Sequence, residues 1–366
     1  MGNITKSSAI TETLVKEIIG GKYNVTKKLP SEHQLMRRFS VARETVRGAL
    51  KELMDRKLVD KRPGYGTYLV DRASRLAMRS FGVIVPDAFH PFYARICRGI
   101  EIGAKRHGYT TLVASLGCGD MYDRSIKAAE FAEVCKRQRV SGLFLQPLQF
   151  LQESEAFNRD ILRIFADTDI PVVLLDSDYL KPPRRSNYDV IGVDNTNIGY
   201  VLARHLIEAG AKRIVYFSNP LPAPNSLRRG NGAGIAVVEA GLKWTNDSFI
   251  FGDARDENFV KRVFSGRTRP DGVIAVNDLL AVRLVKTLAR LGLNVPKDVR
   301  IAGVNGDEEG ELCEPPLTTM VQPCQEIGET AVEMMCRRIA NPSLPPREVM
   351  IAARLCVRDS TRTAGG

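Results

Sequence analysis

The chain has 366 residues, and its 53 Lys and Arg outnumber its 42 Asp and Glu, giving a formal net charge of +11. Hydrophobic residues make up 44% and charged residues 26%, proportions that are ordinary for a globular protein with a sizeable core. These figures exclude a collagen, a small disulfide scaffold and a long disordered tail. No apolar run approaches the roughly 18 residues of a membrane span, and no secretory signal is present, so we expect a cytoplasmic protein.

The positive charge is concentrated near the N-terminus. Residues 1–80 contain 17 Lys and Arg against 8 Asp and Glu, a net charge of +9, whereas the rest of the chain carries only +2. A basic segment joined to a near-neutral body indicates a module that binds a polyanion. Charge alone would fit a solvated basic face equally well.

Short helices and a β-hairpin are expected in the first 70 residues. Helices are predicted at 9–19, from Ser31 onward and at about 42–54, and short strands at 58–59 and 67–70. The turn between the two strands contains a pair of glycines. This order of elements predicts a winged helix-turn-helix domain of the α+β class over residues 1–70.

The third predicted helix carries side chains that can recognise bases in a DNA major groove. Arg can bond guanine O6 and N7 in a fork, Glu can accept from cytosine N4, and Thr can contact a methyl group or a phosphate. Basic residues around the helix would neutralise phosphates and position the domain. The helix carries Arg43, Glu44, Thr45 and Arg47, and Arg37, Arg38, Lys61 and Arg62 flank it. Any one of them could be a solvated surface residue, but their joint placement favours DNA.

Residues 29–70 resemble the GntR-family winged helix over their whole length. The PSE start, the R-x-T-V-R recognition helix and the G-x-G-T wing all stand in register. The resemblance implies DNA contacts by Glu32, His33, Arg43, Thr45, Arg47, Gly64 and Gly66. With Ser31, Glu44 and Arg62 added, these form the predicted DNA-binding set.

Three positions depart from the usual pattern of that family. His33 stands where Arg is usual, which would weaken one contact or make it pH dependent. Ala42 replaces the usual Ser cap of the recognition helix, a loss of roughly 1 kcal/mol. Glu44 stands where Thr is usual, and we expect this change to alter the operator sequence.

After a polar, basic linker predicted at residues 71–80, apolar strands alternate with amphipathic helices. This alternation predicts an α/β domain over 81–366, with parallel sheets covered on both faces in two doubly wound lobes. A ligand would bind in the crevice at the carboxyl ends of the strands. Strands are predicted at 81–85, 110–114, 142–146, 171–175, 190–193, 213–217, 272–276 and 299–304, and helices at 93–107, 196–209 and 279–292.

Polar and aromatic residues fall where such a crevice would bring them together. A carboxylate at the end of a strand can accept from two adjacent hydroxyls, an Arg offers a rigid fork of donors, and an aromatic face can stack on a sugar or base. The predicted effector site is Phe92, Tyr93, Asp176, Asn225, Arg229 and Asp278, with Asp278 pointing into the crevice. Alternatively, the two aspartates only cap helices or pair with Arg229, and Phe92 belongs to the core.

Residues 80–358 resemble the effector-binding core of LacI/GalR regulators, which is similar to periplasmic sugar-binding proteins. Matching stretches include FGVIVPDAFHPFYARICRGIE, DIPVVLLDSD and GVIAVNDLLAVRLVKTL. The resemblance implies a crevice for an effector, usually a sugar or a purine, contacted by the residues named above. Gly303-Val304-Asn305-Gly306 replaces the usual G-F-D-D, so a buried carboxylate near the cleft is expected to be missing. Ala254 lies where a sugar-stacking aromatic is common, which would leave room for a different ligand.

The two resemblances together imply a ligand-responsive transcriptional regulator. We expect a repressor that binds a pseudo-palindromic operator as a homodimer and takes a carbohydrate effector. The alternatives are a purine or sugar-phosphate corepressor, or a transcriptional activator. No cofactor or metal is expected, because the four histidines form no H-E-x-x-H and the seven cysteines no C-x-x-C.

A doubly wound enzyme is the remote alternative. Gly230-x-Gly232-x-Gly234 superficially matches a dinucleotide-binding loop, with Asp253 about 20 residues later. That fingerprint requires a strand directly before the first glycine, whereas the preceding strand is predicted to end near Phe217. We therefore interpret the glycines as close packing at the start of a helix. No catalytic residue is predicted.

Overall fold

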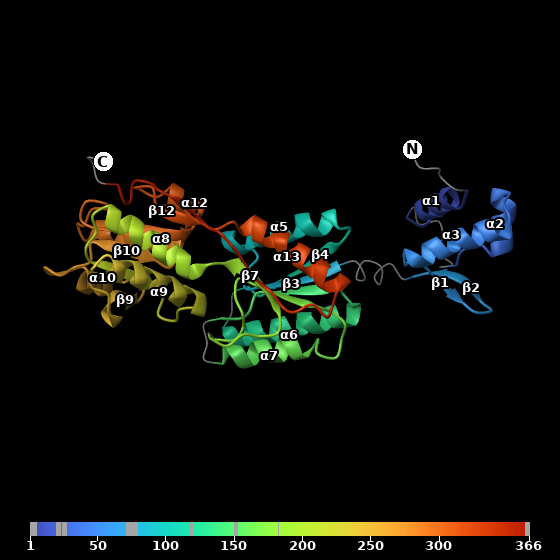
Figure 1. Cartoon of the computed structure of the whole chain (residues 1–366), viewed down its shortest axis with the longest axis horizontal. Helices are drawn as coiled ribbons and strands as arrows, with labels where there is room; N and C mark the ends of the chain where they lie inside the picture. The colour runs from blue at the N-terminus through green and yellow to red at the C-terminus, as the bar shows by residue number, and fades with distance from the viewer. Residues whose placement is uncertain are drawn as a thin grey trace. The chain divides into compact units, whose positions relative to one another are not determined.

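The computed structural model describes residues 6–19, 23, 28–70, 80–117, 120–149, 153–181 and 183–362. The chain divides into two compact units, Met1–Ser80 and Phe81–Gly366 (Figure 1). The predicted linker lies outside the described residues, except for Ser80, which begins a strand. The linker therefore stays a prediction, and each unit is described by itself.

The first unit is a winged helix-turn-helix, as predicted. Its elements are α1 (Lys6–Ile19), α2 (Glu32–Phe39), α3 (Arg43–Asp55), β1 (Val59–Arg62) and β2 (Gly66–Leu69). The two strands are antiparallel, with Arg62 opposite Gly66. Leu14, Leu35 and Leu53 are fully buried where the three helices meet. The hydroxyl of Ser31 accepts from the backbone N–H of Gln34 and caps α2, whereas Ala42 gives α3 no side-chain cap.

The second unit contains two lobes, each built on a six-stranded sheet. The first lobe comprises β3 (Ser80–Val85), α5 (Pro91–Arg106), β4 (Thr110–Ser115), α6 (Met121–Gln138), β5 (Gly142–Leu145), α7 (Ser154–Arg163), β6 (Val172–Leu175), β7 (Asp189–Val193), α13 (Cys324–Ala340) and β13 (Glu348–Ile351). The second comprises α8 (Asn195–Glu208), β8 (Ile214–Ser218), α9 (Pro224–Glu239), a short 3-10 turn (Asn246–Ser248), β9 (Phe249–Phe251), α10 (Glu257–Val263), β10 (Gly272–Ala275), α11 (Asp278–Arg290), β11 (Arg300–Asn305), α12 (Glu308–Glu311), β12 (Thr318–Val321) and β14 (Arg354–Cys356).

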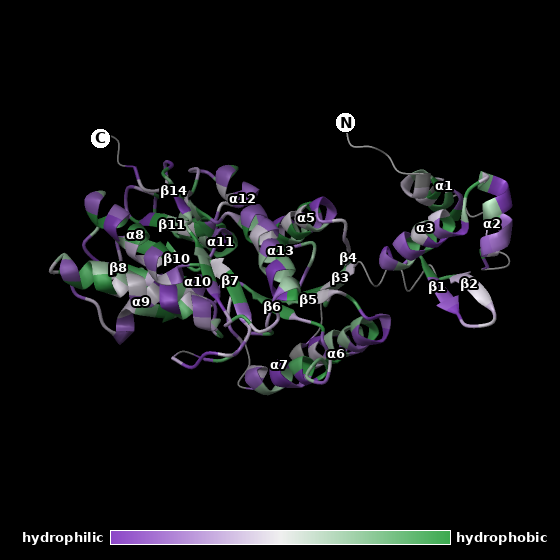
Figure 2. Cartoon of the chain, turned by 45° about the vertical axis from the view of Figure 1, so that its right-hand side comes forward, coloured by the Kyte–Doolittle hydropathy of each residue, from purple (hydrophilic) through white to green (hydrophobic). Residues whose placement is uncertain are grey.

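The strand order is β13-β7-β6-β5-β3-β4 in the first sheet and β14-β12-β11-β10-β8-β9 in the second. Of the described pairings in these two sheets, only that of β12 with β14 is antiparallel. Strands β3, β5, β6, β7, β8 and β10 are buried along their whole length because helices cover both faces. Figure 2 shows these strands in green and the outward faces of the helices in purple.

The chain passes between the lobes three times, at 193–195, 321–324 and 351–354. The second passage returns it to the first lobe, where α13 packs on α5 and β13 pairs with β7. The third passage returns it to the second lobe as β14. Every strand predicted from the sequence is present, and β9, β12, β13 and β14 were not predicted.

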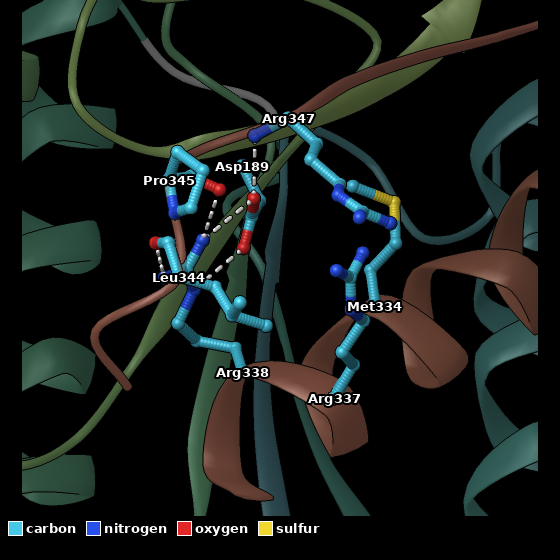
Figure 3. A pocket seen from close by; sticks show the side chains of 7 residues that line it. All are labelled: Asp189, Met334, Arg337, Arg338, Leu344, Pro345 and Arg347. Carbon is cyan, nitrogen blue, oxygen red and sulfur yellow. Dashed lines mark hydrogen bonds and ion pairs between the residues drawn. The ribbon is translucent and has the colours of Figure 1, made fainter. Parts of the chain in front are cut away.

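Arg338, near the end of α13, holds the returning segment of the first lobe in place (Figure 3). Its guanidinium forms a bidentate ion pair with Asp189, with Nε–Oδ2 and Nη2–Oδ1 distances of 2.9 and 3.0 Å. It also donates to three backbone carbonyls within 342–345, and the Arg347 N–H donates to the same carboxylate. The Arg338 and Asp189 side chains are only 16% and 5% exposed, so the pair is largely desolvated.

Glycines allow α8 and α9 to pack at very short range in the second lobe. A Cβ on Gly199 would lie 1.8 Å from the Arg229 carbonyl oxygen, and one on Gly232 would lie 1.9 Å from the Thr196 carbonyl oxygen. The glycine-rich stretch thus serves helix packing, as interpreted from the sequence. It lies inside α9 rather than at a helix start, because Pro224 already begins that helix.

Candidate DNA-binding surface and effector pocket

The exposed face of α3 carries the charged residues that the sequence singled out. Val46, Leu50 and Leu53 recur at helical spacing and bury the opposite face. Arg43 and Arg47 are therefore left outward, with 61% and 47% of their side chains exposed. Glu44 is also exposed, and Thr45 is half-buried.

One carboxylate holds three cations on this surface. Glu32, the first residue of α2, accepts from Arg43 Nε at 3.2 Å, from Arg47 Nε at 3.4 Å and from Lys61 Nζ at 3.0 Å. The hydrogen bond from Lys61 is the main reason that the pKa of Glu32 is lowered to about 2. Glu32 therefore stays ionised at any physiological pH and restrains the two arginines that would enter a groove.

The wing tip combines positive backbone angles with an exposed aromatic. Gly64 and Gly66 have φ values of +77° and +114°, in the region that favours glycine. The guanidinium of Arg62 lies over the ring of Tyr68, 4.7 Å from its centroid. Tyr65, between the glycines, is 73% exposed and was absent from the predicted set. An aromatic in a Gly-x-Gly turn was the available signal for it.

The remaining basic residues of the first unit, which we call the head, separate into two groups. His33 and Arg37 are exposed. Arg38 instead pairs with Glu17 of α1, and its guanidinium lies over the ring of Phe39. It therefore belongs to a local ion pair rather than to the cluster around Glu32.

The body contains a pocket of about 320 Å³ between its lobes. Its lining residues follow the carboxyl ends of β3 and β6 in the first lobe and of β8, β10, β11 and β12 in the second. Five of the six predicted effector residues line it: Phe92, Tyr93, Asp176, Asn225 and Arg229. The lining also includes Asp87, His90, Arg124, Gln149, Asn277, Asn305 and Gln322, which were not predicted.

Arg229 is fixed in the pocket wall by neutral acceptors. Its Nε donates to Asn195 Oδ1 and its Nη1 to the Val276 carbonyl, both at 2.6 Å. Within the described residues it forms no ion pair with Asp176 or Asp278. The alternative of an interlobe salt bridge is therefore not supported, and part of the guanidinium fork remains available to a ligand.

Asp176 and Asn225 meet across the crevice. Asp176 follows β6 of the first lobe with a φ of +65°, and Asn225 lies in α9 of the second. The Asn225 amide donates to the Asp176 backbone carbonyl at 2.8 Å and to its carboxylate at 3.2 Å. Burial raises the pKa of Asp176, and the charge of Arg229 opposes that rise. Asp176 caps no helix, because the described residues between β6 and β7 contain none.

Phe92 and Tyr93 enter the pocket from the first turn of α5. His90 caps that helix by accepting from the Phe92 N–H at 3.3 Å. The two rings pack edge to face, with centroids 5.0 Å apart. Phe92 is 8% exposed and belongs mostly to the core, while burial and the charge of Asp176 raise the pKa of Tyr93.

The predicted orientation of Asp278 is wrong. The side chain is fully buried and does not line the pocket. It accepts from Thr319 Oγ1 at 2.7 Å and from the Asp307 N–H at 2.8 Å, and burial raises its pKa to about 6. Asn277 takes the cap position by accepting from the Leu280 N–H, so α11 begins at Asp278, three residues after β10 ends at Ala275, and Asp278 turns inward. Asn277 faces the pocket in its place.

The two expected departures near the cleft also need correction. A buried carboxylate is present after all: Asp307 is 5% exposed, pairs with Arg95 at 2.7 Å and accepts from the Asn305 amide at 3.0 Å. Asn305, with a φ of +130°, lines the pocket itself. Ala254 is 2% exposed in the core and does not line the pocket, so it leaves no room for a ligand.

Some pocket residues carried a signal in the sequence and others did not. Gln322 directly follows β12, Asn305 ends β11 and Asn277 lies two residues after β10, so amides near strand ends could have been included. Arg124 lies in the first turn of α6, and nothing local distinguishes it from other surface arginines.

In the described part of the chain, no group of three or more His, Cys, Asp and Glu could hold a metal ion. No described helix is long and apolar enough to cross a membrane.

Comparison with known families defines the class of protein. Residues 6–69 match the model of bacterial regulatory proteins of the gntR family, and residues 203–361 match the periplasmic binding protein-like domain. The chain thus joins a GntR-type helix-turn-helix to a periplasmic-binding-protein-like body, as the resemblances implied. This is the architecture of a transcriptional regulator.

Individual relatives share this class. The chain is 26% identical to an HTH-type transcriptional repressor PurR from Photobacterium profundum, over 78% of this chain and 81% of the relative. It is also 26% identical to an arabinose metabolism transcriptional repressor from Geobacillus stearothermophilus, over 98% of both chains. A solved transcriptional regulator CelR–cellobiose complex superposes with a TM-score of 0.65 at 20% identity, covering 98% of this chain and all of that one. The last likeness concerns the fold alone.

Proposed function

We propose that this chain is a ligand-responsive transcriptional repressor, which binds operator DNA through its winged helix and a small effector in the 320 Å³ pocket. The observation that carries the proposal is the contact of Asn225 with Asp176 across that pocket. A ligand that engages either side chain changes how one lobe is held against the other. Its effect on DNA affinity can be no larger than its preference for one arrangement of the lobes.

For the DNA, we assign base contacts to Arg43, Glu44, Thr45 and Arg47 and backbone contacts to the wing. The cluster held by Glu32 supports this assignment, because restrained guanidinium forks match guanine edges. Arg62 and the two wing glycines approach phosphates or the minor groove. Ser31 and His33 at the start of α2 would contact the backbone of the same half-site.

For the effector, a carbohydrate fits the pocket best. Amide, guanidinium and carboxylate groups converge with an aromatic edge, and this combination serves polyol recognition. The full-length likeness to an arabinose metabolism repressor supports the same choice. The regulatory names of the relatives also support a protein without enzymatic activity. It would act in the cytoplasm as a homodimer.

The test begins with an operator selected from random duplex DNA by the full chain. Fluorescence anisotropy then measures operator affinity with and without sugars, sugar phosphates and purines, each first screened by thermal shift. Arg229→Ala should abolish the ligand response and keep operator affinity within about twofold, because Arg229 lies in the effector pocket. Arg228→Ala, on the same helix but outside the lining, is the control. Failure to select any duplex, or an intact response in Arg229→Ala, would contradict the proposal.

A further inference from the structure

We propose that the effector carries an oxyanion, as in a sugar phosphate or a sugar acid, and that Arg124 binds it. The inference deepens the proposed function and rests on it only in taking the crevice to be a ligand site. It concerns one end of the pocket, at the first lobe. The polyol end would lie against Arg229 and the amides of the second lobe.

In the part of the chain that the structure describes, Arg124 is the guanidinium of this pocket that lacks an acceptor. It lines the wall from the first turn of α6, and its Nε is buried with no hydrogen-bond partner. Across the described residues, no carboxylate lies within ion-pair distance of it. Arg229 differs, because Asn195 and Val276 satisfy two of its nitrogens. Arg124 as a whole is half-buried, but its buried Nε is a donor left without an acceptor, which is costly.

The carboxylates that share the pocket have other donors. Asp176 accepts from Asn225, and burial raises the pKa of its carboxyl group. Asp87 accepts from the Phe89 N–H at 2.9 Å. Directly before α6, Asp120 caps the helix by accepting from the Asp123 N–H. The described residues therefore offer Arg124 no carboxylate, and an anionic ligand would supply one.

A small side cavity beside Arg124 has the size and the polar lining that suit one oxygen of an anionic ligand. It measures about 10 Å³ and shares Tyr93, Arg124 and Gln149 with the main pocket. That volume is close to what one water-sized group needs. Gln146 lines the side cavity, is 1% exposed, and its Oε1 is buried without a donor. One oxygen of an anion fits here, accepting from Arg124 and, when it carries a proton, donating to Gln146.

The experiment uses the full chain and inorganic phosphate as the minimal probe. Thermal shift is followed over rising phosphate at constant ionic strength, so that screening stays fixed. Wild type should be stabilised with a millimolar dissociation constant, and Arg124→Gln should weaken that constant at least tenfold. Arg124→Lys should fall between them, since it keeps the charge but loses the fork. Arg137→Gln makes the same change at an exposed position of α6 and should match wild type.

A second comparison separates this inference from the proposed function. D-ribose 5-phosphate is set against D-ribose, and D-gluconate against D-glucose, for binding and for release of operator DNA. Preference for the anionic member that disappears in Arg124→Gln supports the inference and shows whether phosphate or carboxylate is preferred. A neutral sugar that releases operator equally from wild type and Arg124→Gln overturns the inference but leaves the repressor intact. Phosphate protection that is absent in wild type, or unchanged in Arg124→Gln, also overturns it.

Discussion

At the scale of single residues, the DNA-binding surface depends on one acid among many bases. Glu32 reduces the positive charge of the proposed DNA-binding surface, yet it restrains Arg43 and Arg47 in a common position. Net charge controls non-specific binding, whereas side-chain geometry controls discrimination between sequences. A change at Glu32 should therefore move the two kinds of affinity in opposite directions.

We expect Glu32→Gln to weaken specific operator binding by about 1–3 kcal/mol and to strengthen binding to an unrelated duplex. The operator loses restrained guanidinium forks, while any duplex meets one more unit of positive charge. Dissociation constants for the operator and for the unrelated duplex, taken at several salt concentrations, measure the change in specific and in non-specific affinity. Asp55→Asn makes the same charge change at the exposed end of α3 and should leave discrimination intact. Parallel changes on both duplexes would contradict the prediction.

Asp278 makes stability depend on pH. Its folded pKa of about 6 lies above its ordinary value of 3.8, so the folded state binds this proton more tightly than the unfolded state does. The resulting stability is complete below pH 3.8 and is lost as pH rises through 6. We expect this loss to lower the melting temperature of the wild type as the pH rises from 4 to 7. Asp278→Asn should flatten it, and an unchanged profile would refute the assignment.

At the scale of elements, the first lobe depends on a segment that arrives late in the chain. Strand β13 pairs with β7 through residues far apart in sequence, Glu348 with Val190. The Arg338–Asp189 pair fastens the segment that leads into this strand. Because the pair is largely desolvated, removing one partner leaves an uncompensated charge in place.

Arg338→Ala should therefore destabilise the body by about 3–5 kcal/mol. Denaturant unfolding of the full chain, followed by circular dichroism, measures the loss. Arg337→Ala is the matched control, since Arg337 neighbours Arg338 on α13 and forms no ion pair within the described residues. The control should change stability by less than about 0.5 kcal/mol. Equal losses in the two variants would show that the pair contributes nothing specific.

The sequence predicted the helices and strands that have a clear hydrophobic pattern of their own. Interior strands such as β5 and β6 are short apolar runs between helices, so they were visible in the sequence. Strands β9 and β14 have only three residues, and β13 is half exposed at a sheet edge, so none has a strong pattern. The pocket followed the same rule. Asp176 after β6 was found, but the amides near the ends of β10, β11 and β12 were missed. Asp278 was misplaced by a one-residue difference in helix start, and Arg124 depended on how α6 packs.

At the scale of the whole molecule, most of the net positive charge lies in the N-terminal unit, and the effector-binding body is close to neutral. The head carries +9 and the body +2, so salt should act on them differently. Operator affinity should fall steeply with salt because counterions are released from the phosphates. The affinity of the body for a neutral ligand should barely change, whereas an anionic ligand held by Arg124 should weaken modestly. Plots of log Kd against log salt measure the slopes, and equal slopes for DNA and ligand would contradict this division.

The three passages of the chain between the lobes also set an order of assembly on the ribosome. Residues 1–70 can complete the winged helix early, and the second lobe is built mainly from residues 195–321. The first lobe must wait, because α13 and β13 are translated only after residue 324. Domains generally fold as they emerge, N-terminal first. We therefore expect a chain that stops before residue 324 to carry a complete winged helix on an incomplete effector-binding domain, and to bind DNA without responding to the effector.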